Sequence, residues 1–423
     1  MKLGIKKTVA TIWRNKVLFL CVLLFFFSAV LKVYLPTTVL PEVFILGLFV
    51  YGAINPIKKT DALMPGSALP VWILFLLYFV LASLATHWGD DGSGFFNENY
   101  RLLTFLLITI LLGSSKINFL AVAKFCLWCC RFHVFFTLFE LFYLTFVSLG
   151  DFYGVPLVGA AMPELDADGG YLRENDNLIS YGFRPFGLML QPQKTGFVFV
   201  IGAVLEYVIA WVENRKPSVL WNGAFVAISI LQGAKTAFLI LFVIEAAVFF
   251  NYYPSRKNTF GKIMFYVSIA IVSLYIIIHN VALSTIGNDT NARVMDDVTG
   301  FLSYGVFNVL FGIGTPVNKD MLAHGFSCEC YLVRIFCNWG GILTMLLFYY
   351  LARFFLPHDR KVAYVIVIAF FGMVYHYCVI NVYFIALAFS SVICLALYNE
   401  KKCVNNIYIR SHSLSSGNSK SSL

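Results

Sequence analysis

Charged residues are scarce in this sequence of 423 residues: Asp, Glu, Lys and Arg make up only 13% of it. Soluble proteins carry about 25% charged residues, which they need to cover a water-facing surface. Hydrophobic residues make up 60%, with a mean hydropathy of +0.79, and they form blocks of about 17–25, the length that crosses a bilayer as a helix. A soluble enzyme, a disordered protein and an outer-membrane barrel with its period-two strands are therefore excluded. We expect an all-α polytopic membrane protein.

Twelve apolar segments are predicted to be transmembrane helices. They are residues 17–35, 38–54, 69–86, 102–113, 125–148, 196–212, 217–232, 236–253, 263–280, 330–351, 362–378 and 380–398. No cleavage site of small residues follows the first of them, so we expect it to be retained rather than removed as a signal peptide. Residues 116–124 are expected to form a short interfacial helix before the fifth span.

The basic residues are distributed as in a membrane protein with both termini in the cytoplasm. The cytoplasmic segments then hold 21 Lys and Arg with four acidic residues, and the outer side holds nine basic and fifteen acidic residues. Positive charge on the cytoplasmic side orients membrane proteins. The net charge of +9 is explained in this way, and no nucleic-acid partner is expected.

The ten cysteines form no pattern that supports disulfide or metal chemistry. Cys126, Cys129 and Cys130 lie at the start of the fifth span with too few other ligands for zinc, so we interpret them as small apolar residues. Cys328 and Cys330 are two residues apart and are poorly placed to bridge each other. No cofactor and no metal ion are expected.

Two predicted outer loops, at about 149–195 and 281–329, are much longer than the short basic cytoplasmic links. Loops of more than about 15 residues are usually functional or disordered, and the Gly, Pro, Arg and aromatic residues of these two favour function. We expect one polytopic domain over residues 1–403 and a disordered, Ser-rich cytoplasmic tail at 404–423. The unequal loops and the lack of an internal repeat in the sequence argue against a secondary transporter.

Four cations lie on the predicted outer side, which is otherwise acidic: Arg184, Lys194, Lys235 and Arg293. Arginine presents a planar fork of donors that suits phosphate, and lysine presents a point charge. A lipid-linked pyrophosphate at the membrane surface would neutralise these cations, although pairing with outer acids or lipid headgroups is the alternative. His324 and Glu329, next to the tenth span, could take a proton from a sugar hydroxyl. A histidine in a surface loop is the simpler reading of His324.

Several ionisable residues lie within the predicted spans. His133 and Glu140 are seven residues apart and therefore share one face of the fifth span. A carboxylate inside a membrane is a candidate functional group, with a structural hydrogen bond between helices as the alternative, and the same choice applies to Glu206 and Glu245. Arg131 lies near the cytoplasmic end of its span, where we expect its side chain to snorkel to the headgroups.

Four stretches resemble motifs of the O-antigen and capsular polysaccharide polymerases of bacterial envelopes, which share their membrane core with the O-antigen ligases. They are RPFGLMLQPQKTG at 184–196, LQGAKTAF at 231–238, Arg293 followed by FGIG at 311–314, and HGFSCECYLVRIFCNWGGIL at 324–343. The first resembles the Arg-containing stretch that closes the family's first long outer loop. The second resembles a Ser-Arg-Thr turn, with Lys235 where arginine is usual. The last resembles the family's polar or acidic residue followed by an aromatic-aliphatic helix and two glycines.

The resemblance implies a GT-C-like membrane glycosyltransferase in the inner membrane that works without a metal ion. Its substrates would be oligosaccharide repeat units on undecaprenyl pyrophosphate, joined at the outer leaflet. Arg184, Lys235 and Arg293 would hold the pyrophosphate, and Glu329 with His324 would activate the acceptor hydroxyl. Stabilisation of the departing pyrophosphate would be the main catalytic effect. A chain-length regulator and a flippase are further candidate partners.

Other functions remain open at this point. An O-antigen ligase, which transfers finished polymer to a lipid A core, uses the same donor chemistry. A flippase or other transporter would also have about twelve spans, but that class has short outer loops, internal symmetry and charged residues along a central path. A structural scaffold would not explain basic residues on an acidic side. We expect the polymerase.

Overall fold

A computed structural model describes residues 16, 18–28, 47, 63, 105–146, 187–189, 192–231, 235–252, 299–300, 302–303, 305–312, 331–375 and 382–417. Their regular structure is helical, with no strand among them, which confirms the all-α class for this part of the chain. The labelled helices are α6 (Phe119–Phe146), α11 (Pro192–Val212), α12 (Val219–Leu231), α13 (Lys235–Tyr252), α16 (Val306–Phe311), α18 (Tyr331–Phe355), α19 (Arg360–Tyr375) and α21 (Tyr383–Gly417).

Among the described residues, three helical stretches are long and apolar enough to cross a membrane: Phe119–Glu140, Lys194–Val212 and Tyr383–Lys402. Shorter apolar helices are Phe105–Ser114, Val219–Leu231, Thr236–Ala246 and Trp339–Phe355. These helices are consistent with a membrane protein. The predicted spans at 38–54, 69–86 and 263–280 lie outside the residues that the structure describes, apart from Gly47.

The stretch 1–403 that we expected to form one domain contains parts of two compact units. Unit 1 comprises Met1–Leu76, Glu98–Ala247 and Tyr350–Leu423, and unit 2 comprises Leu77–Asn97 and Val248–Tyr349.

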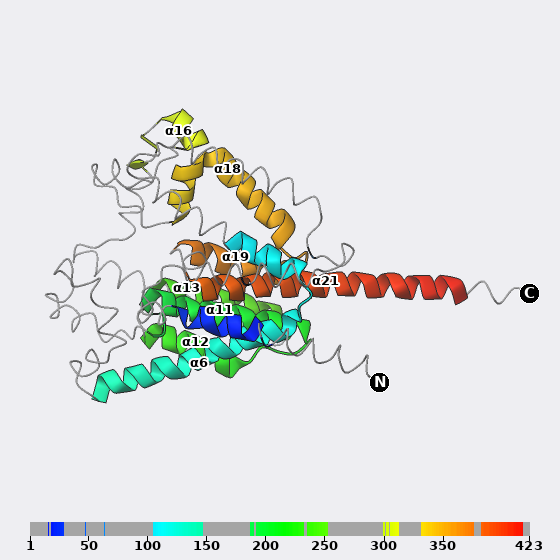
Figure 1. Ribbon diagram of the computed structural model, residues 1–423, viewed down its shortest axis with the longest axis horizontal. Coiled ribbons are helices and arrows are strands. Elements are labelled where there is room, and N and C mark those ends of the chain that lie inside the picture. Colours follow the sequence, from blue (N-terminus) through cyan, green and yellow to red (C-terminus); the bar gives the residue numbers. More distant parts are fainter. Residues whose placement is uncertain are drawn as a thin grey trace, which may run out of the picture. The chain divides into compact units, whose positions relative to one another are not determined.

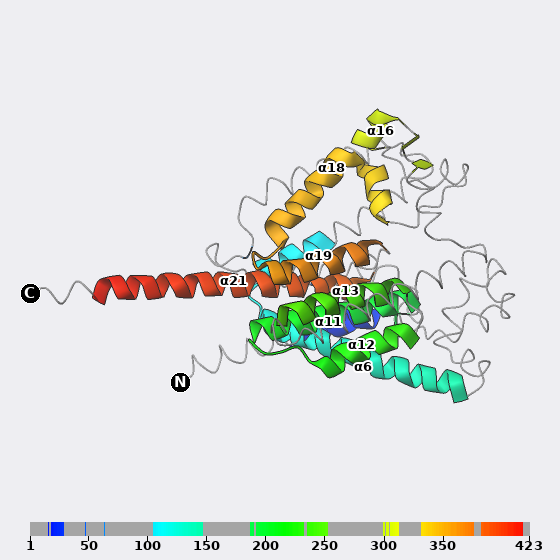
Figure 2. The ribbon, with the colours of Figure 1, turned by 180° about the vertical axis from the view of Figure 1, so that it is seen from behind.

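Helix α11 is the centre of unit 1. Every residue from Thr195 to Ala210 is buried, and the helix contacts α6, α12, α19 and α21 (Figures 1 and 2). A helix that is apolar on all sides is expected to be enclosed by others in this way. Its ends follow from local sequence: proline suits the first helical position, where its missing N–H is not needed. After Val212, Asn214 adopts a left-handed conformation with φ of 52° and closes a Schellman motif, in which Arg215 N–H donates to the Ala210 carbonyl at 2.9 Å.

Helices α6 and α11 are antiparallel and keep a seven-residue register. Lys124 of α6 pairs with Glu213 just beyond α11, and Arg131, seven residues later, pairs with Glu206, seven residues earlier. Residues 18–28 run parallel to α6, since the ring of Phe19 meets Phe125 and that of Phe26 meets Phe132. These pairings define two ends of the unit 1 bundle.

At one end, called the basic end, α6 begins, α11 ends and α19 begins. The indole of Trp211 donates to the Asp359 carboxylate at 3.2 Å, and Glu400 of α21 accepts the backbone N–H groups of His358 and Asp359 at 2.9 and 2.7 Å. The described charged residues here include Lys124, Arg215, Lys216, Arg360, Lys361, Lys401, Lys402, Glu213, Asp359 and Glu400. The opposite end, called the Gly187 end, holds Phe26, His133, Gly187, Thr195 and Phe384.

Two predicted boundaries were wrong. Residues 119–124, which we expected in a separate interfacial helix, are the first turns of α6, which Asn118 caps through its side chain at 3.1 Å to Ala121 N–H. Residues 404–417, which we expected to be disordered, are the end of α21, and this last part of the helix projects beyond the other helices of unit 1 (Figures 1 and 2). Both errors share a cause, because no glycine or proline interrupts either stretch until Gly417.

The face of α6 turned away from the bundle carries exposed aromatic side chains. The exposed fractions of Trp128, Phe135, Phe139 and Phe142 are 55%, 60%, 62% and 61%. Scattered exposed apolar residues are normal in soluble proteins, but a continuous aromatic stripe marks a contact surface. This stripe is consistent with contact with lipid acyl chains, in agreement with the length of α6.

Helix α18 is bent at Gly340, where φ is 72° and ψ is 167° (Figure 1). Only glycine adopts this region readily. Within unit 2 the end of α16 packs onto the bend, so that a Cβ atom at Gly340 would overlap Leu310 O, Phe311 C and Gly312 N. Gly340 and Gly341 are the two glycines of the stretch 324–343, and small residues of this kind permit close contact between helices. Close contact is present at Gly340, but the partner is the end of α16 and the backbone there is not helical.

We therefore expect Gly340→Ala to destabilise this part of unit 2 by more than about 2 kcal/mol, because both the backbone angle and the overlap oppose a side chain. Gly341→Ala is the matched control: a Cβ there reaches only Val309 O at 3.4 Å, and alanine favours helix. Thermal unfolding of the two purified variants in detergent measures the difference. Equal unfolding temperatures for both variants would contradict the assignment of the bend.

Candidate functional site

A buried turn precedes α11. Gly187, Leu188 and Met189 form it, and the exposed fractions of Leu188 and Met189 are 6% and 2%. Gly187 has φ of +62°, a left-handed conformation that favours glycine. The turn lies within the stretch 184–196, the first of the four that resemble polymerase motifs.

The carboxylate of Glu140 on α6 holds this turn. Its Oε2 accepts a hydrogen bond from the backbone N–H of Gly187 at 2.8 Å, and Glu140 is 2% exposed. A backbone group outside a helix has to find a partner when it is buried among apolar helices. The Glu140 carboxylate therefore attaches the end of the first long loop to the helix bundle.

The surroundings of Gly187 leave no room for a side chain. A Cβ atom there would lie 2.6 Å from His133 Nε2 and 2.6 Å from Thr195 Oγ1. His133 is fully buried, with its ring 5.7 Å from both Phe26 and Phe199. The turn is thus fixed by a hydrogen bond on its N–H side and by steric fit at its Cα atom.

His133, Thr137 and Glu140 follow one another at spacings of four and three residues, which places them on one face of α6. We call this the α6 polar face. Within the described part of the chain, neither ring nitrogen of His133 nor Oγ1 of Thr137 has a hydrogen-bond partner, although both side chains are buried. Buried polar atoms normally have partners, so this face offers unused donors and acceptors next to the turn.

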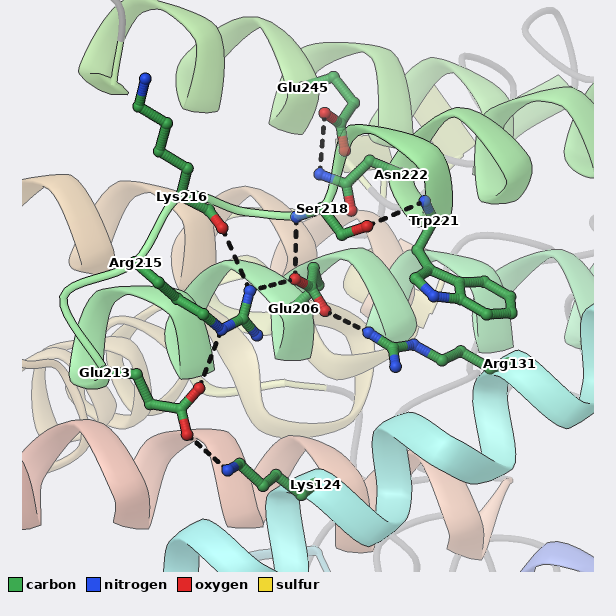
Figure 3. A network of polar contacts seen from close by, with 10 residues as sticks. All are labelled: Lys124, Arg131, Glu206, Glu213, Arg215, Lys216, Ser218, Trp221, Asn222 and Glu245. Atoms are coloured by element: carbon green, nitrogen blue, oxygen red, sulfur yellow. Dashed lines mark hydrogen bonds and ion pairs between the residues drawn. The ribbon is translucent and has the colours of Figure 1, made fainter.

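A network of charged residues lies toward the basic end (Figure 3). The Glu206 side chain is fully buried and accepts from Arg131 at 2.7 Å, from Arg215 at 2.6 Å and from the backbone N–H of Ser218 at 2.9 Å. The Arg131 guanidinium also lies 4.8 Å from the centre of the Trp221 ring. Our expectation that Arg131 snorkels to the headgroups was wrong, because a buried carboxylate on α11 faces it directly.

Glu213 and Glu245 extend this network. Glu213 binds Lys124 and Arg215, with oxygen–nitrogen distances of 2.5 and 2.9 Å, and these hydrogen bonds lower the pKa of its carboxyl group below the ordinary 4.5. The amide of Asn222 on α12 donates to Glu245 on α13 at 3.1 Å. The sequence left open whether the carboxylates within the spans are functional groups or make structural hydrogen bonds. In the structure Glu140, Glu206 and Glu245 each accept a hydrogen bond from another element.

The structure places the predicted site residues only in part. Lys194 lies half-buried in the first turn of α11, seven residues after Gly187, and Lys235 is the first residue of α13, with only its backbone described. The other four lie outside the described residues: Arg184, Arg293, His324 and Glu329. The residue that the sequence reasoning did not connect to the loop is Glu140, although an acid inside a span was the available signal.

The candidate functional site is therefore the Gly187 turn with the α6 polar face and the start of α11. The turn and the start of α11 are both part of the stretch 184–196, which contains Arg184 and Lys194. The Glu206 carboxylate binds donors from α6 and from the 213–218 connection, so we assign its network to holding α6, α11 and that connection together.

Removing the central carboxylate should cost far more than removing the peripheral one. Glu206→Leu leaves two arginines without their shared partner, and we expect a loss of about 3–5 kcal/mol in unfolding free energy. Glu213→Gln removes a more exposed ion pair, worth less than about 1 kcal/mol. Unfolding in mixed detergent micelles measures both variants, and a similar cost for the two would contradict the central position of Glu206.

Acid should remove the contribution of Glu213. Because its pKa is lower in the folded than in the unfolded protein, its stabilising effect is complete above the ordinary value of 4.5 and is lost as the pH falls through the folded value. We expect the stability difference between wild type and Glu213→Gln to be constant between about pH 7 and pH 5, and to shrink below that. A difference that instead grows on acidification would contradict this sign.

Comparison with known proteins adds no relative: no family model, no curated protein and no solved structure matches this chain. What the chain does has therefore to be inferred from its own residues.

Proposed function

We propose that this chain is a polysaccharide polymerase of the O-antigen type. It joins oligosaccharide repeat units carried on undecaprenyl pyrophosphate, at the outer leaflet of the bacterial inner membrane. The proposal includes about twelve transmembrane helices and two long outer loops. The four stretches that resemble polymerase motifs suggest the family. The hydrogen bond from Gly187 to Glu140 and the close packing around Gly187 are the observation that supports the location of the site.

The charge of the basic end supports the orientation. Positive residues favour the cytoplasmic side of a membrane, and the described residues of this end include Lys124, Arg215, Lys216, Lys401 and Lys402. Residues 18–28 start toward this end and α21 leaves the bundle there, so both termini would be cytoplasmic. The Gly187 end would then face the outer leaflet, where the lipid-linked substrate is used.

The attachment of the Gly187 turn supports a binding role for the 184–196 stretch. Donors stabilise a developing charge best when they are held in place before the reaction. Glu140 fixes the turn at 2.8 Å, and Lys194 stands on the first turn of the buried helix α11. Arg184 and Lys194, two cations of the predicted pyrophosphate site, thus lie before and after the fixed Gly187 turn in the sequence.

In the proposed reaction, the bond between the anomeric carbon of the donor sugar and the pyrophosphate oxygen breaks, while a bond from that carbon to the acceptor hydroxyl oxygen forms. Arg184, Lys194, Lys235 and Arg293 stabilise the negative charge on the departing pyrophosphate. Glu329 with His324 takes the proton of the acceptor hydroxyl. No step requires a metal ion.

The size of the surface polysaccharide in a deletion strain tests the activity. We expect single repeat units on the lipid A core, because unpolymerised units are still exported and transferred. Gel electrophoresis of lipopolysaccharide and analysis of undecaprenyl-linked glycans provide the readout. Long polymer retained on undecaprenyl, with bare core at the surface, would instead identify a ligase, and normal polymer would reject both activities.

The site assignment has its own test. Arg184→Ala and Arg293→Ala, expressed at wild-type level in the deletion strain, should each reduce long polymer by at least about tenfold, since each removes a charge-assisted contact to pyrophosphate. Arg353→Ala is the matched control, because Arg353 is exposed near the end of α18, on the predicted cytoplasmic side. Full-length polymer from both site variants would show that these arginines do not hold the substrate.

A further inference from the structure

We propose that Glu140 is a positioning residue for the polymerase reaction, acting through its hydrogen bond to Gly187 to hold the substrate-binding part of the first outer loop. This inference rests on the proposed function. Neither the resemblance nor the sequence assigns such a role to Glu140, which lies within the fifth predicted span and 47 residues before the turn that it holds.

Chain geometry gives the reason that this contact matters. A residue adds at most about 3.6 Å of reach, so with Gly187 fixed, the Cα atom of Arg184 is confined to within about 11 Å of it. If the turn were released, the next described attachment along the chain would be Pro192 at the start of α11. Arg184 would then be eight residues from its attachment and could reach about 29 Å.

The larger reach lowers the effective concentration of the Arg184 guanidinium at the substrate. The ratio of the two accessible volumes is about 18, so the effective concentration of Arg184 near the pyrophosphate falls by roughly tenfold or more when the turn is free. The position of Lys194 changes little, because it belongs to α11 itself. Loss of the contact should therefore weaken substrate use without unfolding the bundle.

The contact needs an acceptor oxygen rather than a titratable group. A glutamine at this position still presents a carbonyl oxygen to the Gly187 N–H, whereas leucine presents none. If Glu140 acted on the acceptor hydroxyl as a base, glutamine and leucine would be equally damaging. The two substitutions therefore separate positioning from proton transfer.

Steric contacts also hold the Gly187 turn in place. His133 Nε2 and Thr195 Oγ1 enclose Gly187 so closely that a methyl group at that position meets both. Gly187→Ala should therefore release the turn from the loop side while leaving α6 unchanged. It provides a second variant with the same expected consequence as Glu140→Leu, reached through a different residue.

The test uses the full-length protein in lipid nanodiscs, with two independent readouts. Amide hydrogen exchange of the peptide containing residues 187–189 reports on the turn, and polymerisation of lipid-linked repeat units gives kcat and KM. We expect Glu140→Leu and Gly187→Ala to speed exchange of the turn and to lower kcat/KM by on the order of tenfold. Glu140→Gln should remain within about threefold of wild type in both readouts.

Glu245→Leu is the matched control, because it removes another membrane glutamate whose described partner is Asn222 of α12 and not the loop. It should leave exchange at residues 187–189 unchanged. Unchanged exchange in Glu140→Leu, or a glutamine variant as impaired as the leucine variant, overturns the positioning role. A wild-type protein that fails to polymerise any lipid-linked unit, while the exchange results are as expected, overturns the proposed function and leaves the anchoring contact established.

Discussion

In the interior of unit 1, a polar group has to find its partner within the protein, because the helices around α11 leave it no water. This constraint organises both ends of that helix. Toward the basic end, the buried Glu206 carboxylate collects two guanidinium groups and a backbone N–H. At the other end, the Glu140 carboxylate accepts the N–H of a turn that would otherwise be buried without a partner. Two acids thus determine where the connections before and after α11 can run.

The two ends differ in what their buried acids bind. Glu206 accepts from Arg131, Arg215 and the backbone N–H of Ser218, and so joins α6, α11 and the connection that follows α11. Glu140 accepts from Gly187 in the turn at the end of the first long loop. Buried polar atoms without a described partner occur at both ends: the ring nitrogens of His133 and Oγ1 of Thr137 on the α6 polar face, and Arg131 Nε, Asn222 Oδ1 and Glu245 Oε1 in the network. The contacts of the two acids therefore distinguish the ends: one acid holds the scaffold and the other holds the loop.

Hydropathy predicted the positions of the longer described helices, because a membrane-length apolar block specifies a helix by itself, but it did not predict the short α16. The errors came where nothing in the local sequence stops a helix, as at residues 119–124 and 404–417. The site was less predictable. Pairing of Arg131 with Glu206, or of Glu140 with Gly187, depends on the register between segments far apart in sequence, and one sequence does not encode that register in any local pattern. The acids could be singled out, but their partners could not.

The seven-residue register of α6 against α11 has a mechanical consequence. Lys124–Glu213 and Arg131–Glu206 have equal spacing on both helices, so sliding one helix along the other by a single turn breaks both ion pairs at once. No intermediate position preserves either of them. The two helices therefore behave as one rigid body. A movement at the Gly187 end has to displace the turn relative to this pair of helices, because the helices do not slide along each other.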